Sequence, residues 1–296
     1  MDFTTYLITN NYSNSTIKVH TLRIKRFKQW IKDYGLQAKE LQYNDLLQYI
    51  QYLRKERNYT ESSTNNEIRA VKIYYDYLIE IGITGENPAE NTHIKGKHAQ
   101  VIIDILTEEE LEDLYYSYEI EHHDTYFKAS RLRDKVVLGL LVFQGVKPIE
   151  IYHLQDEYLN LRKGQIDIPS TRRSNKRTLN LKPLQIIELL TYTQSTKEYL
   201  SKRIKTHNDE QLIFGSIDQI RTIASRIIRN LKKYNHKIKN LGQIRSSIII
   251  NWLSQNNLRK TQYLAGHRYI SSTERYQQDD LENLHEIVNN FHPISE

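Results

Sequence analysis

Apolar residues recur at helical spacing along most of this 296-residue chain. In the segment 15–35 the residues that share the spacing are Ile17, Leu22, Ile24, Phe27, Trp30 and Ile31. The chain contains only 10 glycines and 5 prolines, which favours long helices over a turn-rich β protein. The same periodicity predicts further helices over residues 43–59, 62–82, 106–115, 134–145, 183–200, 217–235, 243–255, 258–265 and 272–290.

Two segments depart from this helical pattern. Residues 165–168 (QIDI) and 178–181 (TLNL) alternate apolar and polar side chains around a basic turn, which predicts an antiparallel β-hairpin. The polar segment 84–100 contains glycine and proline and is typical of an interdomain linker. We therefore expect a mainly α protein with a helical domain, a linker and an α+β domain with a small antiparallel sheet, over residues 1–89, 90–104 and 105–296.

Charge is distributed unevenly along the chain, whose net charge is +6. Residues 161–177 carry six Lys/Arg and one Asp, a charge of +5, and residues 217–240 carry seven and one, a charge of +6. Residues 277–296 carry five acids and no Lys or Arg, a charge of −5. Concentrated basic segments indicate a polyanionic partner, although solvated helix faces would have the same composition.

Composition also excludes several classes of chemistry. The chain has no cysteine, which removes disulfides, thiol catalysis and thiolate metal sites. No apolar run reaches the roughly 18 residues that span a bilayer, and the first residues do not resemble a signal peptide. His122 and His123 lie beside two acids, but no third ligand is evident, so a solvated segment is favoured over a metal site. We expect a cytoplasmic protein that uses no cofactor and no metal and does not act at a membrane.

The segment LAGHRYISSTERY, residues 264–276, contains a histidine and a tyrosine nine positions apart. On one continuous helix, at about 100° per residue, His267 and Tyr276 would face opposite sides. Gly266 can end one helix, and Ser271 with Glu274 can cap the next. Tyr276 would then lie near the positive end of a new helix, which favours a phenolate or a bound phosphate. A nucleophile and a packing tyrosine both fit this pattern.

Arg245 lies in the segment LGQIRSSIIINWL. Ile248, Ile249 and Trp252 follow it at positions i+3, i+4 and i+7, so Arg245 continues an apolar stripe. A guanidinium on an inward face needs a partner, because an unpaired buried charge is costly. A carboxylate or a phosphate would fit, and the planar guanidinium can bind a phosphate through two hydrogen bonds.

Together these segments resemble the tyrosine-type site-specific recombinases, the family of phage integrases and Xer-type recombinases. The arrangement L-A-G-H-x5-T-x2-Y, with His267, Thr273 and Tyr276, is similar to the family's last motif. The segment IRSSIIINWLSQNNLRKTQ resembles its arginine-bearing helix, and VFQGVKPIEIYHL resembles its first active-site segment. The first ninety residues look like its SAM-like core-binding domain. The resemblance covers nearly the whole chain in the same order.

The resemblance implies a fold and a reaction. The fold would be a helical core-binding domain followed by an α+β catalytic domain. The enzyme would cut DNA through a 3′-phosphotyrosyl intermediate and release a free 5′-hydroxyl, without metal or ATP. Tyr276 would be the nucleophile, Arg245 would hold the non-bridging oxygens, and His267 would donate to the phosphate or manage the proton.

Three positions depart from the family pattern. Lys147 stands where the family has its first arginine, and Gly242 stands where it has a histidine, a role that Gln243 or His236 could take. The lysine that serves as general acid on the family's hairpin has no clear equivalent, because counting back from residues 178–181 reaches Arg172.

The hairpin turn offers other groups for these roles. Arginine is a poor general acid because its pKa exceeds about 12. We therefore expect Lys176 to donate the proton, and Arg172 and Arg173 to contact phosphate. Arg177 and Arg268 are further candidates for contacts to DNA.

The family also implies partners. Its members act on double-stranded DNA at a specific site and assemble as tetramers that exchange a C-terminal helix, and this chain would belong to a mobile element. Here such a helix would use the apolar residues Leu281, Leu284, Ile287, Val288 and Phe291. A DNA-binding relative that has lost catalysis and a type IB-like topoisomerase remain as alternatives. The target sequence and the direction of recombination are not encoded in any motif of the chain.

Overall fold

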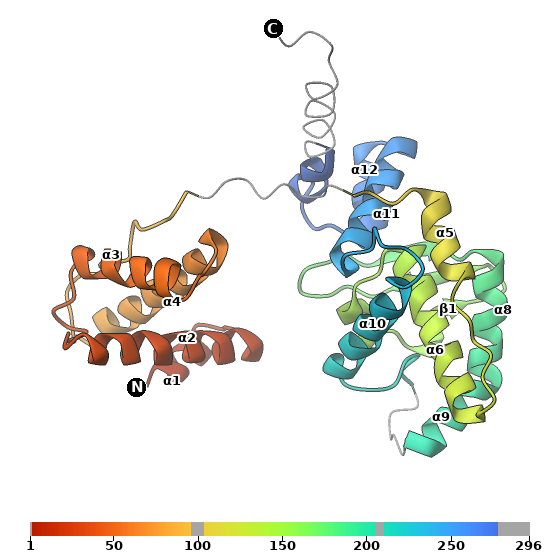
Figure 1. The fold of residues 1–296 in the computed structure, drawn as a ribbon, viewed down its shortest axis with the longest axis horizontal. Helices are drawn as coiled ribbons and strands as arrows, with labels where there is room; N and C mark the ends of the chain where they lie inside the picture. The colour runs from red at the N-terminus through yellow and green to blue at the C-terminus, as the bar shows by residue number, and fades with distance from the viewer. Residues whose placement is uncertain (1, 96–103, 205–209, 278–296) are drawn as a thin grey trace, which may run out of the picture. The chain divides into compact units, whose positions relative to one another are not determined.

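The computed structural model describes residues 2–95, 104–204 and 210–277 (Figure 1). The chain divides into two compact units, Met1–Ala99 and Gln100–Glu296, and each has its own hydrophobic core. Within the described residues, the mainly helical fold and the small antiparallel sheet are confirmed. None of the helices in these residues is both long and apolar enough to cross a membrane.

The first unit is entirely helical where it is described. Its elements are α1 (Phe3–Thr9), α2 (Asn14–Asp33), α3 (Tyr43–Gln51), the π-helical turn η1 (Tyr52–Glu56) and α4 (Glu61–Glu80). Ser13 and Thr60 cap α2 and α4 through their hydroxyls. The core is aromatic: Phe27 packs edge-on against Tyr49 with ring centroids 4.9 Å apart. The tyrosines of this unit that lie in its core therefore serve packing.

The segment that follows α4 stays on this unit as far as Ile94. Ala89 is fully buried in the first core. The Asn65 side chain donates to the Ile94 carbonyl and accepts from the Ile94 amide, both at 2.9 Å. The expected linker thus includes residues that pack against α4, and residues 96–103 lie outside the described part of the chain.

The second unit is built around one buried helix, α6 (Thr125–Val142). Besides the turn η3, it contacts the helices α5 (Glu108–Tyr116), α8 (Pro183–Thr191), α9 (Lys197–Ile204), α10 (Ile217–Leu231) and α11 (Leu241–Gln255) (Figure 1). The remaining elements are α7 (Pro148–Tyr152), the 3-10 turn η2 (Asp156–Tyr158), the π-helical turn η3 (Tyr192–Thr196), α12 (Leu258–Ala265) and three strands. Every residue of α6 from Leu132 to Val142 is buried, as expected for a helix surrounded on all sides.

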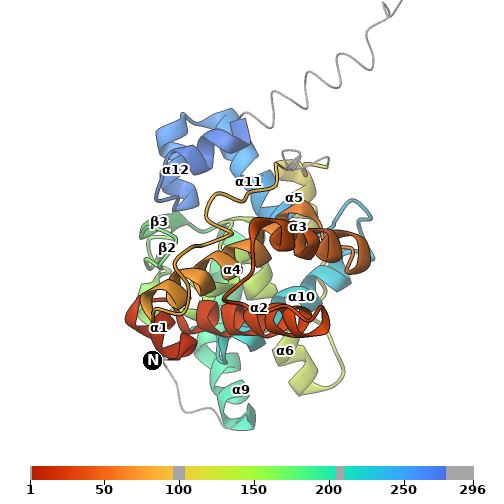
Figure 2. The same cartoon turned by 90° about the vertical axis from the view of Figure 1, so that its left-hand side faces the viewer.

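The strands are β1 (Leu159–Asn160), β2 (Gln165–Ile168) and β3 (Arg177–Asn180), in the antiparallel order β1-β2-β3. Leu179 lies opposite Ile166, and Arg177 opposite Ile168. The predicted hairpin is therefore confirmed, although β3 begins one residue earlier than expected. Helix α12 lies against β3, so the end of α12 and the hairpin turn come together (Figure 2).

Several helix boundaries differ from the sequence-based expectation. Helix α6 begins at Thr125 rather than 134, because the Asp124 carboxylate caps it by accepting from the Tyr126 and Phe127 amides. The short helices α1 and α7 were not expected from periodicity. The predicted C-terminal helix is helical over residues 271–277, and its exchange residues Leu281 to Phe291 lie outside the described part of the chain.

Candidate active site

The chain turns sharply after α12, where the sequence predicted a helix break. Gly266 takes a left-handed conformation with φ 65°, which suits glycine at the end of a helix. The following helix begins at Ser271, and the Ile270 carbonyl accepts from the Thr273 and Glu274 amides. Ser271 is thus inside the helix, and the expected capping box with Glu274 is wrong.

The break brings His267 and Tyr276 together. Their rings are nearly parallel, with an interplanar angle of 9° and centroids 5.9 Å apart. His267 Nδ1 lies 2.9 Å from the hydroxyl of the buried Thr273, which fixes the ring. Burial, as the largest cause, and the nearby positive charges of Arg245, Lys147 and Arg177 together lower the pKa of His267 to about 4. The imidazole is therefore neutral at pH 7.

Arg245 joins two segments of the site through backbone carbonyls. Its Nη2 donates to the Ala265 carbonyl at 2.6 Å, and its Nη1 donates to the Gly145 carbonyl. The side chain is partly buried, and burial lowers its pKa, with Glu150 acting in the opposite direction. Among the described residues Arg245 therefore forms no ion pair with a carboxylate, and its partners within the protein are the Gly145 and Ala265 carbonyls.

Lys147 occupies the residue before the short helix α7. Its amide donates to the Glu150 carboxylate at 2.8 Å, and Pro148 starts the helix. Burial is the largest cause that lowers the pKa of Lys147, and the positive charges of Arg245, Arg177 and Arg173 act in the same direction. Together, and with Glu150 opposing them, they bring this pKa to about 8.

Arg177 lies inside the protein, and this placement corrects its expected contact with DNA. Its side chain and that of Glu150 are both 0% exposed. The guanidinium binds the carboxylate through two hydrogen bonds, Nη1 to Oε1 at 2.9 Å and Nη2 to Oε2 at 3.1 Å. Burial alone would raise the pKa of Glu150, but Arg177 and the Lys147 amide hold it at about 2. Both terminal nitrogens of Arg177 are thus held by Glu150 inside the protein rather than presented to a DNA backbone.

The hairpin turn is fixed against the turn that carries His267. Ser174 and His267 form a β-bridge, and the Asn175 amide donates to the Gly266 carbonyl at 3.0 Å. The Tyr263 hydroxyl accepts from the Thr178 amide at 3.0 Å. Residues nearly a hundred positions apart in sequence therefore form one wall of the site.

A cavity of about 430 Å³ opens beside these residues. Most of the side chains that line it are positively charged. The lining consists of Lys147, Arg172, Arg173, His267, Arg268, Tyr269, Ser272, Arg275 and Tyr276. No carboxylate lines it, and none of its five cations forms an ion pair within the part of the chain that the structure describes. Sequence reasoning did not select Arg275, although its position next to Tyr276 was an available signal.

Some expected residues are placed elsewhere. Lys176 is exposed and does not line the cavity, whereas Arg172 and Arg173 do. The Gln243 amide donates to the Asp104 carbonyl at 2.6 Å and the Lys237 carbonyl at 2.9 Å, so it has a structural role. His236 is exposed and also absent from the cavity lining. Neither Gln243 nor His236 replaces the histidine missing at Gly242.

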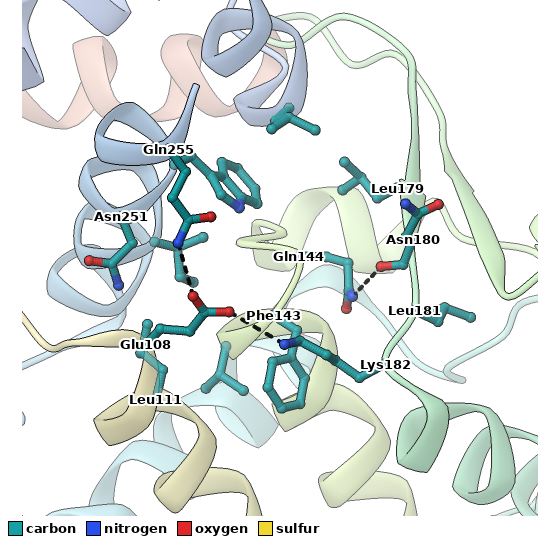
Figure 3. Close-up of a pocket in the computed structure, with 14 residues that line it drawn as sticks. Glu108, Leu111, Phe143, Gln144, Leu179, Asn180, Leu181, Lys182, Asn251 and Gln255 are labelled. Carbon is teal, nitrogen blue, oxygen red and sulfur yellow. Dashed lines mark hydrogen bonds and ion pairs between the residues drawn. The ribbon is translucent and has the colours of Figure 1, made fainter. Parts of the chain in front are cut away.

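Two other groups of polar side chains lack this concentration of positive charge. A pocket of about 260 Å³ between α5, α11 and β3 holds Glu108, which binds Lys182 at 3.4 Å and Gln255 at 3.0 Å (Figure 3). The His122 and His123 rings stack on each other, and no group of three metal-ligating side chains occurs among the described residues. The positive cavity is therefore the candidate active site.

Comparisons with known proteins agree with this geometry. Residues 1–84 match the N-terminal SAM-like domain of phage integrases, and residues 104–283 match the phage integrase family. The tyrosine recombinase XerC of Staphylococcus aureus strain JH9 is 23% identical over 299 residues, covering 98% of this chain and 94% of the relative.

Solved structures show the same fold. A lambda integrase dimer bound to a COC′ core site has a TM-score of 0.63 at 16% identity, over 94% of this chain and 75% of that one. The Tn1549 transposon integrase in complex with transposon right end DNA has a TM-score of 0.63 at 14% identity, over 98% of both chains. Because the family match over residues 104–283 covers more than half of the chain and includes His267 and Tyr276, this chain belongs to the phage integrase family, the tyrosine recombinases.

Proposed function

We propose that the protein is a site-specific DNA recombinase that cuts and rejoins DNA through Tyr276. One observation carries this proposal: Tyr276 and His267 lie side by side in a cavity whose described lining has five cations and no carboxylate. Such a cavity suits a phosphodiester, whose negative charge needs fixed positive partners. Membership of the tyrosine recombinase family supports the same assignment.

The chemistry assigned to the site is a transesterification. The Tyr276 oxygen attacks the scissile phosphorus, a 3′-phosphotyrosyl bond forms, and the bond to the 5′-oxygen breaks. Because one ester replaces another, the bond energy is kept and rejoining needs no nucleotide hydrolysis. Negative charge gathers on the equatorial oxygens in the transition state, and the surrounding cations stabilise it.

Arg245 and His267 would act on the non-bridging oxygens. Arg245 gives one hydrogen of each Nη to a carbonyl, so each Nη keeps a second hydrogen for an acceptor. His267 is held by Thr273 through Nδ1, which leaves Nε2 for the phosphate or for the phenol proton. Arg172, Arg173, Arg268 and Arg275 would bind the phosphates around the scissile bond.

The proposed partner is double-stranded DNA at a specific recombination site. The structures similar to this chain include a lambda integrase bound to a core site and a transposon integrase bound to transposon end DNA. These relatives support an enzyme of a mobile element, and we propose that it acts at the nucleoid. We also propose a tetramer on DNA with exchange of the C-terminal helix, which the mass of the complex with its site DNA would test.

A nicked suicide substrate tests the nucleophile. Such a duplex loses a short fragment after cleavage, so the covalent complex accumulates and is read as a shifted band on a denaturing gel. We expect the complex with the unmodified chain and none with Tyr276→Phe. Tyr269→Phe is a matched control, because Tyr269 lines the same cavity but is 70% exposed.

Other outcomes would identify the alternatives. DNA binding without a covalent complex on the cognate site would show a relative that binds DNA but no longer cuts it. Relaxation of a supercoiled plasmid that lacks any recombination site would show a type IB-like topoisomerase instead.

A further inference from the structure

Cleavage leaves an oxygen that needs a proton. The 5′-oxygen departs as an alkoxide, which is a poor leaving group unless a general acid protonates it. Resting on the function proposed above, we propose that the Lys147 ammonium donates this proton, and that the arginines of the hairpin turn hold phosphate charge instead. This assigns a proton-donating role to a position at which the resembled family has an arginine.

The cavity geometry selects Lys147. Among the residues that the structure describes, it is the single lysine in the lining of the cavity that contains Tyr276, and its backbone is anchored there by the Glu150 carboxylate at 2.8 Å. The other lining cations are arginines, which keep their protons because their pKa exceeds about 12. His267 is neutral at pH 7, since its pKa is lowered to about 4. Lys176, the other candidate, lies outside the lining.

The buried ion pair beneath the cavity keeps Lys147 able to release its proton. Glu150 is the carboxylate closest in sequence to Lys147, and a direct ion pair would bind the ammonium and raise its pKa. Arg177 instead occupies both oxygens of Glu150, at 2.9 and 3.1 Å. No carboxylate forms an ion pair with Lys147 within residues 104–204 and 210–277. Arg177 is thus a positioning residue that keeps Glu150 away from the Lys147 ammonium.

Four charged groups from four segments set the protonation of Lys147. Arg245 of α11, Arg177 of β3 and Arg173 of the hairpin turn disfavour the ammonium, and Glu150 of α7 favours it. With burial as the largest cause, these bring the pKa to about 8. Lys147 is therefore mostly charged at pH 7 yet close to the pH at which it can give up its proton, as efficient general acids are.

The step balances in protons and bonds. The bond from the Tyr276 oxygen to phosphorus forms as the bond from phosphorus to the 5′-oxygen breaks. The Lys147 proton moves to the 5′-oxygen, which leaves as a hydroxyl, and the phenol proton is lost to water at the open side of the cavity. In rejoining, the bond from the 5′-oxygen to phosphorus forms as the phosphotyrosyl bond breaks. The neutral Lys147 amine takes the proton of the attacking 5′-hydroxyl, and the departing Tyr276 phenolate regains its proton from water.

A suicide substrate with sulfur in place of the scissile 5′-oxygen tests this role. A thiolate leaves without a proton, so loss of the general acid no longer matters. We expect Lys147→Ala to cleave the oxygen substrate at least about 100-fold more slowly than the unmodified chain does. On the sulfur substrate, we expect its cleavage rate to be within about tenfold of the rate of the unmodified chain. Lys147→Arg, which keeps the charge, gives the same pattern.

The comparison variants separate this role from the others. Arg172→Ala and Arg245→Ala stay slow on both substrates, since they bind the phosphate rather than the leaving group. Lys163→Ala, an exposed lysine outside the cavity, is unaffected on both. Equal slowing of Lys147→Ala on both substrates, or rescue of Lys176→Ala by sulfur, overturns the assignment. Failure of the unmodified chain on both substrates, with its cognate site, overturns the proposed recombinase function itself.

Discussion

At the scale of single residues, the protonation of Lys147 gives the site a defined pH dependence. Its pKa is lowered to about 8, chiefly by burial. As the general acid, Lys147 must be in its ammonium form for the oxygen substrate to be cleaved, and this form is lost above about pH 8. Cleavage of the sulfur substrate does not depend on this form. We expect the ratio of the two cleavage rates, oxygen over sulfur, to be constant below about pH 8 and to fall about tenfold per pH unit above it.

The effect of Tyr276 ionisation cancels in this ratio, because Tyr276 attacks both substrates alike. Single-turnover cleavage rates between pH 6 and 10 give the ratio, and Lys147→Arg is the control whose ratio shows no break near pH 8. A ratio that is flat through this range would contradict the assignment.

Gly266 is the second residue on which the site depends. It has φ +65, and a Cβ at this position would lie 2.9 Å from Cζ of the buried Arg177. Gly266→Ala therefore combines backbone strain with a clash against the Arg177 guanidinium, next to His267 in the chain. We expect a loss of about 1–3 kcal/mol in the free energy of unfolding and a loss of covalent complex.

Gly35→Ala is a matched control for that variant. Gly35 has the same φ of +65, but no atom lies within 4 Å of an added Cβ. It carries the backbone strain alone and should keep cleavage. Urea unfolding and the suicide substrate measure the two effects, and equal cleavage by both alanine variants would show that the Arg177 contact is unimportant.

At the scale of elements, sequence reasoning found most of what brings the site together. Gly266 ending α12 and the hairpin of residues 165–181 followed from local turn and strand chemistry, and both occur. Helix α7 was missed because five residues are too few to show a helical period. The Arg177–Glu150 pair joins residues 27 positions apart, and no local pattern encodes such a contact.

The orientation of Arg177 could nevertheless have been inferred. Side chains alternate across a strand, so residues at i and i+2 share a face. Extending the predicted strand 178–181 by one residue places Arg177 on the face of Leu179, which is buried, and Lys176 on the other. The basic run 161–177 is therefore not one surface: within it, Arg172 and Arg173 line the cavity, and Arg177 supports the site from inside.

At the scale of the whole molecule, the proposed chemistry belongs to one unit. Every residue that lines the cavity lies between 147 and 276, within the unit Gln100–Glu296, and that unit has its own core. The first unit contributes an independent helical core. A protein of residues 100–296 should therefore fold alone and keep the nucleophile, the cations and the Arg177–Glu150 pair together.

We expect residues 100–296 to form the Tyr276 covalent complex once bound, but to need at least about tenfold more protein for half-maximal complex, since contacts of the first unit with DNA are lost. Titration of the fragment against the suicide substrate, with its Tyr276→Phe form as the control, measures both quantities. If half-maximal complex requires the same concentration as the full chain, the first unit does not contribute to DNA binding. If a folded fragment bound to DNA forms no covalent complex, catalysis depends on the first unit, because all the proposed catalytic groups are already present in the second.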